Sequence, residues 1–228
     1  YCVEKAIRLP RRSFMATDAL AHILIINKKP SDENIQLYRL NDSHKLSECL
    51  SVSKDQAVER LDYDFHVNGV MAECVNVQSN NKIPLGDIVI ELKRGRHSSS
   101  DVRQSPFPIF HTTDIESKHF GKWISLRQYC SKANSQDGTA SRLITASPGD
   151  RLISRVGRNL EGKILGISYG YPVISDCIFR LRVPKKYRQN VLDQLTSRRG
   201  VDWIAAHSYG VGARQLSKSD LLTFPLCF

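Results

Sequence analysis

Apolar residues along this chain fall into short runs separated by turn-forming residues, a pattern typical of strands rather than of long helices. Three such runs occupy residues 3–9, 19–27 and 34–40. The run at 19–27 contains four consecutive Ile or Leu residues and is interrupted only by His22, so it predicts a strand that is buried on both faces. Together the three runs predict one end of an α/β sheet.

A short helix and a polar loop are expected to follow this sheet. Ser53 and Gln56 have the spacing of a capping box, which predicts a helix that begins after Ser53. Residues 79–82 are polar and rich in turn formers, and they predict a domain boundary. The predicted organisation is a small sheet in residues 1–52, a helical connector in 53–81 and a second domain in 82–228.

The second domain is expected to begin with short extended elements. Residues 83–92 predict a turn followed by a strand. Residues 93–105 contain basic residues and three consecutive serines, and they predict a loop. Residues 106–110 predict a short extended segment.

The rest of the second domain is expected to mix strands with one clear helix. Residues 148–184 contain three runs rich in β-branched side chains, separated by Gly, Asn, Asp or Pro. This pattern predicts strands joined by tight turns, with a basic turn at 154–159. Residues 185–199 carry a helical apolar stripe between Pro184 and Gly200. The predicted fold class is therefore α/β, of the mixed α+β kind: a small sheet remnant followed by a domain of mixed strands and helices.

The composition is that of an ordinary globular protein. Hydrophobic residues make up 41% of the chain and charged residues 25%. No apolar run is long enough to cross a bilayer, so no membrane partner is expected. Six cysteines are scattered without a Cys-x-x-Cys pair, which indicates reduced thiols in a cytoplasmic protein and predicts no metal site.

The excess positive charge is confined to the second domain. Residues 1–81 hold 10 Lys and Arg against 11 Asp and Glu, a net charge of −1, whereas residues 82–228 hold 23 against 12, a net charge of +11. Many of the arginines lie in turns rich in Gly and Ser. This distribution favours a phosphate-binding surface over a merely solvated one.

Five segments of the second domain occur in a recognisable order. They are LGDIV at 85–89, FPIFHTTDI at 107–115, PGDRLISRVGR at 148–158, ISDCIFRLRVP at 174–184 and GVGARQLSKSDLLTFPL at 210–226. In order and spacing they resemble the target recognition domains of Type I and Type IIG-like restriction-modification systems, found in specificity subunits and in fused adenine methyltransferases. The resemblance implies sequence-specific binding of double-stranded DNA.

The first domain has a second resemblance. AIRLP at 6–10 and TDALAHILIINKK at 17–29, with Phe14 between them, resemble the C-terminal tail of an N6-adenine DNA methyltransferase. The sequence contains neither the catalytic Asn-Pro-Pro-Tyr or Asp-Pro-Pro-Tyr tetrapeptide nor a glycine-rich cofactor loop. The resemblance thus implies that a separate catalytic half binds S-adenosylmethionine and methylates a flipped adenine. It implies no cofactor in this chain, and it gives the methyltransferase half and a restriction subunit as partners. We expect the chain alone to be without catalytic activity.

Reading a DNA sequence requires hydrogen-bonding side chains that reach base edges from a rigid frame. Arginine pairs with guanine and asparagine with adenine, whereas lysine suits phosphates. The candidates that we expect in loops, facing the bases, are Arg94, Arg96, Arg103, Arg155, Arg158, Asn159 and Arg214. The candidates for phosphate contacts are Lys93, Arg151, Lys163 and Lys218.

Two other functions compete with this interpretation. A metal-dependent, restriction-like nuclease would use Asp87, Glu91 and Lys93. In one predicted strand the two carboxylates would lie about 13 Å apart, too far to share an ion, so Asp62 or Asp64 would have to join them. An RNA-binding module is disfavoured because aromatic residues make up 8% of the chain and form no paired motif on a predicted strand.

Overall fold

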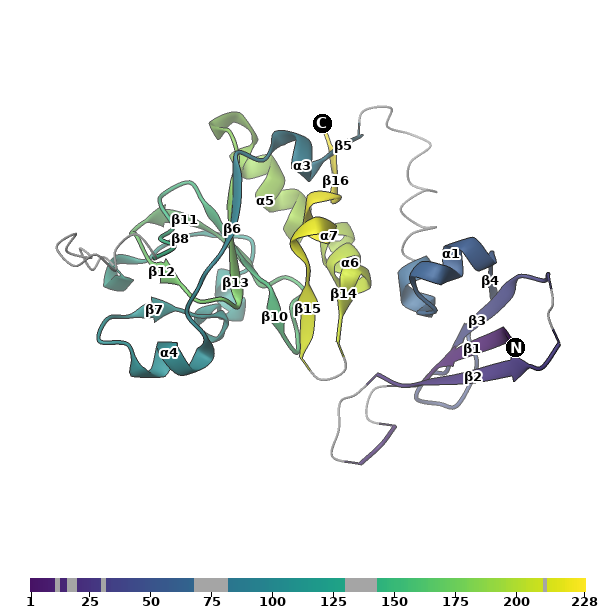
Figure 1. The fold of residues 1–228 in the computed structure, drawn as a ribbon. Coiled ribbons are helices and arrows are strands. Elements are labelled where there is room, and N and C mark those ends of the chain that lie inside the picture. Colours follow the sequence, from purple (N-terminus) through teal and green to yellow (C-terminus); the bar gives the residue numbers. More distant parts are fainter. Residues whose placement is uncertain (11–12, 16–19, 30–31, 68–81, 130–142, 211–212) are drawn as a thin grey trace. The chain divides into compact units, whose positions relative to one another are not determined.

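The chain folds into two compact units in the computed structural model (Figure 1). One comprises Tyr1–Asn80; the other comprises Asn81–Tyr209 and Ala213–Phe228. The structure describes all residues except 11–12, 16–19, 30–31, 68–81, 130–142 and 211–212. Most of the predicted boundary loop, at 79–81, therefore lies outside the described residues.

The first unit is built on a four-stranded sheet with the order β2-β1-β3-β4. Strand β1 (Cys2–Arg8) pairs antiparallel with β2 (His22–Asn27) and parallel with β3 (Ile35–Arg39), and β3 pairs antiparallel with β4 (Leu50–Val52). Helix α1 (Lys54–Glu59) follows. These elements confirm the three predicted strands and the predicted helix. The buried core of this unit consists of Ala6, Ile35, Leu37, Val52 and Ala57.

The capping box of α1 is present in full. The Ser53 side chain accepts a hydrogen bond from the Gln56 backbone N–H, and the Gln56 side chain accepts one from the Ser53 backbone N–H. Two donors at the helix start are thereby satisfied, which explains why the helix begins where the local sequence predicts.

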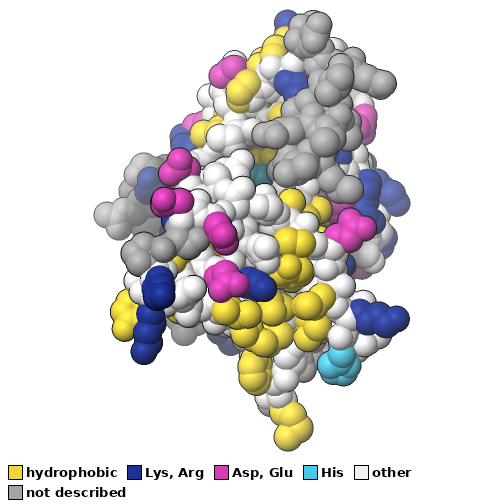
Figure 2. All heavy atoms as spheres, turned by 90° about the vertical axis from the view of Figure 1, so that its right-hand side faces the viewer, with side chains coloured by type: hydrophobic (Ala, Val, Ile, Leu, Met, Phe, Trp, Pro, Cys, Tyr) yellow, Lys and Arg dark blue, Asp and Glu magenta, His cyan; other side chains and the backbone are white. Residues whose placement is uncertain are grey.

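Strand β2 is not buried as the sequence predicts. Its four apolar residues, Ile23 to Ile26, are 41–53% exposed, and exposed apolar side chains gather on the face shown in Figure 2. No β2 residue belongs to the core of this unit or packs against it, and β2 lies at the edge of the sheet, where β1 is its one partner strand among the described residues. An apolar run can predict a strand, but the burial of that strand depends on whether other elements pack on its two faces, which the run itself does not determine.

The second unit is organised around a five-stranded sheet with the order β6-β13-β9-β11-β8. Neighbouring strands are antiparallel except β11 and β8, which are parallel. The strands are β6 (Glu91–Arg94), β8 (Trp123–Ser125), β9 (Arg151–Ser154), β11 (Ile164–Tyr169) and β13 (Ile178–Arg182).

This sheet is buried on both faces, because alternate residues of its central strands belong to different cores. Ile153 and Phe179 pack with the helices of this unit, whereas their neighbours Leu152 and Ile178 pack with Phe110 and its surroundings. Figure 1 shows the helices α5, α6 and α7 on one side of the sheet and β7 and β12 on the other. The mixed α/β class predicted from the sequence is confirmed.

The predicted helix at 185–199 is two helices, α5 (Arg188–Thr196) and α6 (Arg198–His207), preceded by a 3-10 turn (Lys185–Tyr187). The sequence predicts that Gly200 ends a helix, but Gly200 lies inside α6. A Cβ at this position would overlap the carbonyl oxygens of Gln194 and Leu195, so the glycine permits close contact between the two helices. The actual break is at Ser197, whose side chain accepts a hydrogen bond from the Gly200 backbone N–H and caps α6.

Two other predicted segments differ in detail. The basic loop at 93–105 contains the end of β6 and helix α4 (Ser99–Gln104), which a capping box from Ser98 to Asp101 begins. The basic turn at 154–159 contains a short strand, β10 (Val156–Gly157), in the sheet β10-β15-β14. The remaining elements are α3 (Leu85–Ile88), α7 (Lys218–Leu222), β5 (Lys82–Pro84), β7 (Ile109–Phe110), β12 (Val173–Ile174), β14 (Ser208–Tyr209), β15 (Arg214–Leu216), β16 (Pro225–Cys227) and 3-10 turns at Thr112–Asp114, Ser117–His119 and Arg127–Tyr129. Among the described residues, no helix is both long and apolar enough to cross a membrane.

A buried ion pair ties β13 to the turn that precedes β9. Asp150 is 1% exposed, and its two carboxylate oxygens accept hydrogen bonds from Nε and Nη2 of Arg182, each at 2.8 Å. The same carboxylate accepts the Ser147 backbone N–H at 2.9 Å. A carboxylate this deeply buried needs such partners, because an unpaired charge in the interior is costly.

We predict that Asp150→Asn lowers the free energy of unfolding, measured by urea denaturation. The expected loss is roughly 2–4 kcal/mol, below the full cost of an isolated buried charge because the Arg182 side chain is 33% exposed. The matched control is Asp202→Asn, which removes an exposed pair with Arg198 on α6 and should cost at most about 0.5 kcal/mol. Equal effects of the two substitutions would contradict the structural importance of the Asp150 pair.

Candidate nucleic-acid interface

One end of the five-stranded sheet gathers the basic side chains of the second unit. The antiparallel register pairs Arg94 with Phe179 and Ser154 with Ile178, so that β6 and β9 end where β13 begins. The segments that leave these strand ends carry six of the candidate DNA-binding residues, which we call the basic edge: Arg94, Arg96, Arg155, Arg158, Asn159 and Lys163.

Gly95 allows the chain to turn tightly at this edge. A Cβ at this position would overlap the carbonyl oxygens of Ile174 and Ser175, so the backbone passes closer to the neighbouring segment than any side chain would permit. Just beyond it, His97 forms a parallel bridge with Ser175. Arg94 and Arg96, on either side of the glycine, are both exposed.

Arg155 is held in place by the start of β13. Its backbone N–H donates to the Cys177 carbonyl oxygen at 2.8 Å, and its Nη1 donates to the Asp176 carbonyl oxygen at 3.2 Å. The guanidinium lies 5.8 Å from the centre of the Phe179 ring. Burial, and then the charge of Arg94, lower the pKa of Arg155, although an arginine remains charged under ordinary conditions. The side chain is thus half-buried and oriented, whereas Arg158 and Asn159 are exposed.

Two candidates lie in the interior, contrary to the expectation of surface positions. Arg151 is 0% exposed; its Nη1 donates to the Gly149 carbonyl oxygen at 3.1 Å, and its guanidinium lies 5.2 Å from the Trp123 ring centre. Burial lowers the pKa of Arg151 to about 10. Arg214 lies in β15 rather than in a loop, is 9% exposed, and binds the Glu161 carboxylate and the Ala205 carbonyl oxygen. Neither guanidinium is therefore placed on the surface for contact with DNA.

The three remaining candidates are also exposed. Lys93 is in β6, where it forms an ion pair with Glu91. Arg103 is on α4, and its Nε donates to the Ser99 carbonyl oxygen at 3.2 Å. Lys218 is the first residue of α7. Lys93 directly precedes Arg94 but is paired with Glu91, and Arg103 and Lys218 lie on helices, so we do not count the three in the basic edge.

The candidate nuclease residues do not share a strand as predicted. Asp87 is on α3, whereas Glu91 is in β6. The Glu91 carboxylate is occupied by ion pairs with Lys93, Arg180 and Arg182, and the hydrogen bond from Lys93 is the main cause that lowers its pKa. Within the described part of the chain, no three His, Cys, Asp or Glu side chains are arranged to hold a metal ion.

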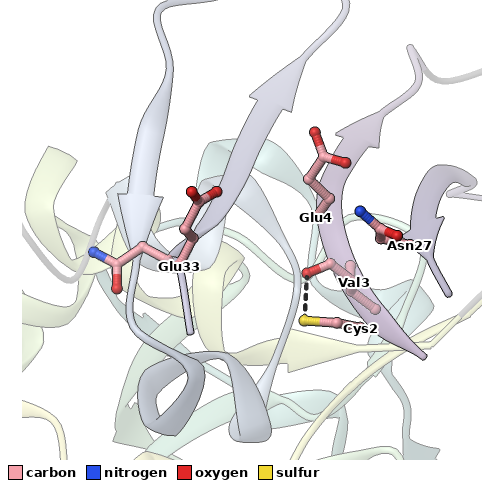
Figure 3. A pocket seen from close by; sticks show the side chains of 6 residues that line it. Cys2, Val3, Glu4, Asn27 and Glu33 are labelled. Carbon is pink, nitrogen blue, oxygen red and sulfur yellow. Dashed lines mark hydrogen bonds between the residues drawn. The ribbon is translucent and has the colours of Figure 1, made fainter. Parts of the chain in front are cut away.

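A small hollow in the first unit is a poor candidate for an active site. It is lined by Cys2, Val3, Glu4, Asn27 and Glu33, with Asn34 (Figure 3). The dashed line in Figure 3 marks the contact from the Cys2 thiol to the Val3 carbonyl oxygen, at 3.6 Å. The lining combines two carboxylates with two amides and a thiol, and it belongs to the unit that does not carry the basic edge.

Comparison with known proteins gives a likeness of fold. No family model matches the chain, and no curated protein matches it. Among solved structures, the type IIG restriction endonuclease BpuSI matches 99% of this chain with a TM-score of 0.51 and 13% identity. A Type-I restriction-modification system S subunit from M. genitalium matches 68% (TM-score 0.37, 15% identity, 36% of that chain), and an HsdS subunit from Thermoanaerobacter tengcongensis matches 76% (TM-score 0.36, 14% identity, 40% of that chain). This chain spans 36% of the length of BpuSI. The resemblance drawn from the sequence motifs is thus confirmed at the level of fold: the chain is similar to about a third of a type IIG restriction endonuclease.

Proposed function

We propose that this chain is the DNA-specificity part of a restriction-modification adenine methyltransferase, and that its second unit binds duplex DNA and reads a short sequence with the basic edge. The observation that carries the proposal is the gathering of Arg94, Arg96, Arg155, Arg158 and Lys163 at one sheet end. Guanidinium groups donate to guanine in the major groove and to phosphates, so one surface of this kind can supply both contacts.

The charge balance supports a polyanion as the ligand. Residues 82–228 carry a net charge of +11, whereas residues 1–81 carry −1. Elsewhere in the second unit two arginines are paired with acids: Arg182 with Asp150 and Arg214 with Glu161. Positive charge is thus concentrated in exposed or half-buried side chains at one sheet end, where it can meet DNA phosphates.

The first unit bears on the partners of this chain. The fold matches about a third of a longer restriction endonuclease, and β2 presents four exposed apolar residues at a sheet edge. We propose that this sheet is completed by a methyltransferase catalytic half, which binds S-adenosylmethionine and methylates adenine, and that a restriction subunit or domain is a further partner. The chain itself has no tetrapeptide or glycine-rich loop suited to that cofactor, and we assign it no step of methyl transfer.

The proposed function predicts that the chain binds duplex DNA with an affinity that falls steeply as the salt concentration rises. If the +11 region neutralises about five phosphates, the slope of log affinity against log salt is about −4 or steeper. Fluorescence anisotropy of a labelled duplex between low and moderate salt measures this slope. A slope near zero would remove the nucleic-acid proposal.

A second prediction concerns the basic edge itself. The double variant Arg94→Gln, Arg96→Gln should bind its preferred duplex at least roughly 10-fold more weakly while the melting temperature stays unchanged, because both side chains are exposed. The matched control is Lys185→Gln, Lys186→Gln, which removes two exposed charges just beyond the opposite end of β13. If the control weakened binding as much as the edge variant, the assignment of the interface to this sheet end would be wrong.

A further inference from the structure

One carboxylate lies inside the basic edge. Asp176 is in the short connection between β12 and β13, and it is half-buried. Its backbone N–H donates to the His97 carbonyl oxygen at 2.8 Å, and its own carbonyl oxygen accepts Nη1 of Arg155. Two hydrogen bonds therefore hold the backbone of Asp176 in place.

The carboxylate of Asp176 is used differently from those of several other acids of this unit. Asp150, Glu91 and Glu161 each form an ion pair with an arginine. Among the described residues, no ion pair includes Asp176, although Arg155 is close enough to feel its charge. The neighbouring arginine donates to the backbone of Asp176 instead of to its carboxylate.

Nor does this carboxylate cap a turn or helix. Asp101 and Asp114 accept the backbone N–H groups of Ser98 and His111, which is the usual local use of an aspartate. The contact that the structure gives the Asp176 carboxylate is the Cys177 thiol, which donates to Oδ1 at 3.4 Å. A thiol is a weak donor, so this acceptor keeps most of its hydrogen-bonding capacity.

A carboxylate beside the arginines of the basic edge weakens the attraction for DNA in general, so its place at this edge calls for a specific partner. The partner must donate hydrogen bonds from within the DNA. In the major groove those donors are the amino groups of cytosine and adenine, and aspartate accepts from cytosine N4. Resting on the proposed function, we infer that Asp176 is a specificity-determining residue that accepts the amino group of a cytosine, beside the donor-only arginines.

The test is a selection of preferred sequences from randomised duplexes, carried out with the unaltered chain and with Asp176→Asn. Asparagine keeps the shape and the Oδ1 acceptor for Cys177 but adds donors and removes the charge. At one base pair we expect discrimination in favour of cytosine to fall by roughly 5- to 150-fold, or to change to adenine, with other positions unaffected. Affinity for random duplex should be unchanged or higher, because a negative charge has been removed from the edge. The matched control is Asp202→Asn on α6, which makes the same charge change and should select the original sequence.

The outcomes separate this inference from the proposed function. If the unaltered chain selects a sequence and Asp176→Asn selects the same one, the inference is overturned and the proposed function stands. A uniform gain in affinity without a changed preference also overturns it, because the carboxylate would then act by charge alone. If Asp176→Asn lowered the melting temperature and weakened binding to every duplex, Asp176 would have a structural role, and the inference would again be overturned. If the unaltered chain selects no sequence, the proposed function fails, and the inference fails with it.

Discussion

Burial of the five-stranded sheet on both faces is the constraint on which the second unit depends. Its central strands alternate between two apolar cores, so charged side chains along them need a partner or must lie near the strand ends. Toward one end Asp150 and Arg182 satisfy each other, with Glu91 against Arg180 and Arg182 close by. At the other end the arginines of the basic edge outnumber the acids. Charges are therefore paired at one end of the sheet, whereas the other end carries an excess of positive charge.

A charged edge of this kind suits sequence recognition because its side chains leave from rigid strands. Arg155 is held by two backbone carbonyl groups and the Phe179 ring, so less conformational entropy is lost when it binds a base than for a free surface arginine. The backbone between Arg94 and Arg96 is held by the close approach at Gly95. Asp176 adds an acceptor to these donors, and recognition of a base pair benefits from both kinds of group.

Local sequence patterns predicted the elements whose causes are local. The three strands of the first unit follow from β-branched runs, and α1 follows from the Ser53 capping box. The errors concern features that depend on distant residues. Arg214 is buried because Glu161, 53 positions away, meets it, and Gly200 lies within a helix because α5 packs against it. Likewise, the gathering of the basic edge depends on the pairing of β6, β9 and β13, although each arginine could be named from the sequence.

The most direct test of the central claim is hydrogen–deuterium exchange of the chain with and without a saturating duplex. The account predicts that DNA slows exchange at backbone amides of residues 94–97, 155–159 and 176–177, which form the basic edge and its carboxylate. The amides at the start of α5, where Arg188 lies against Gly149, and of the turn around Asp150, toward the opposite end of the sheet, should be unaffected. Protection confined to those latter segments, with none at the basic edge, would contradict the account.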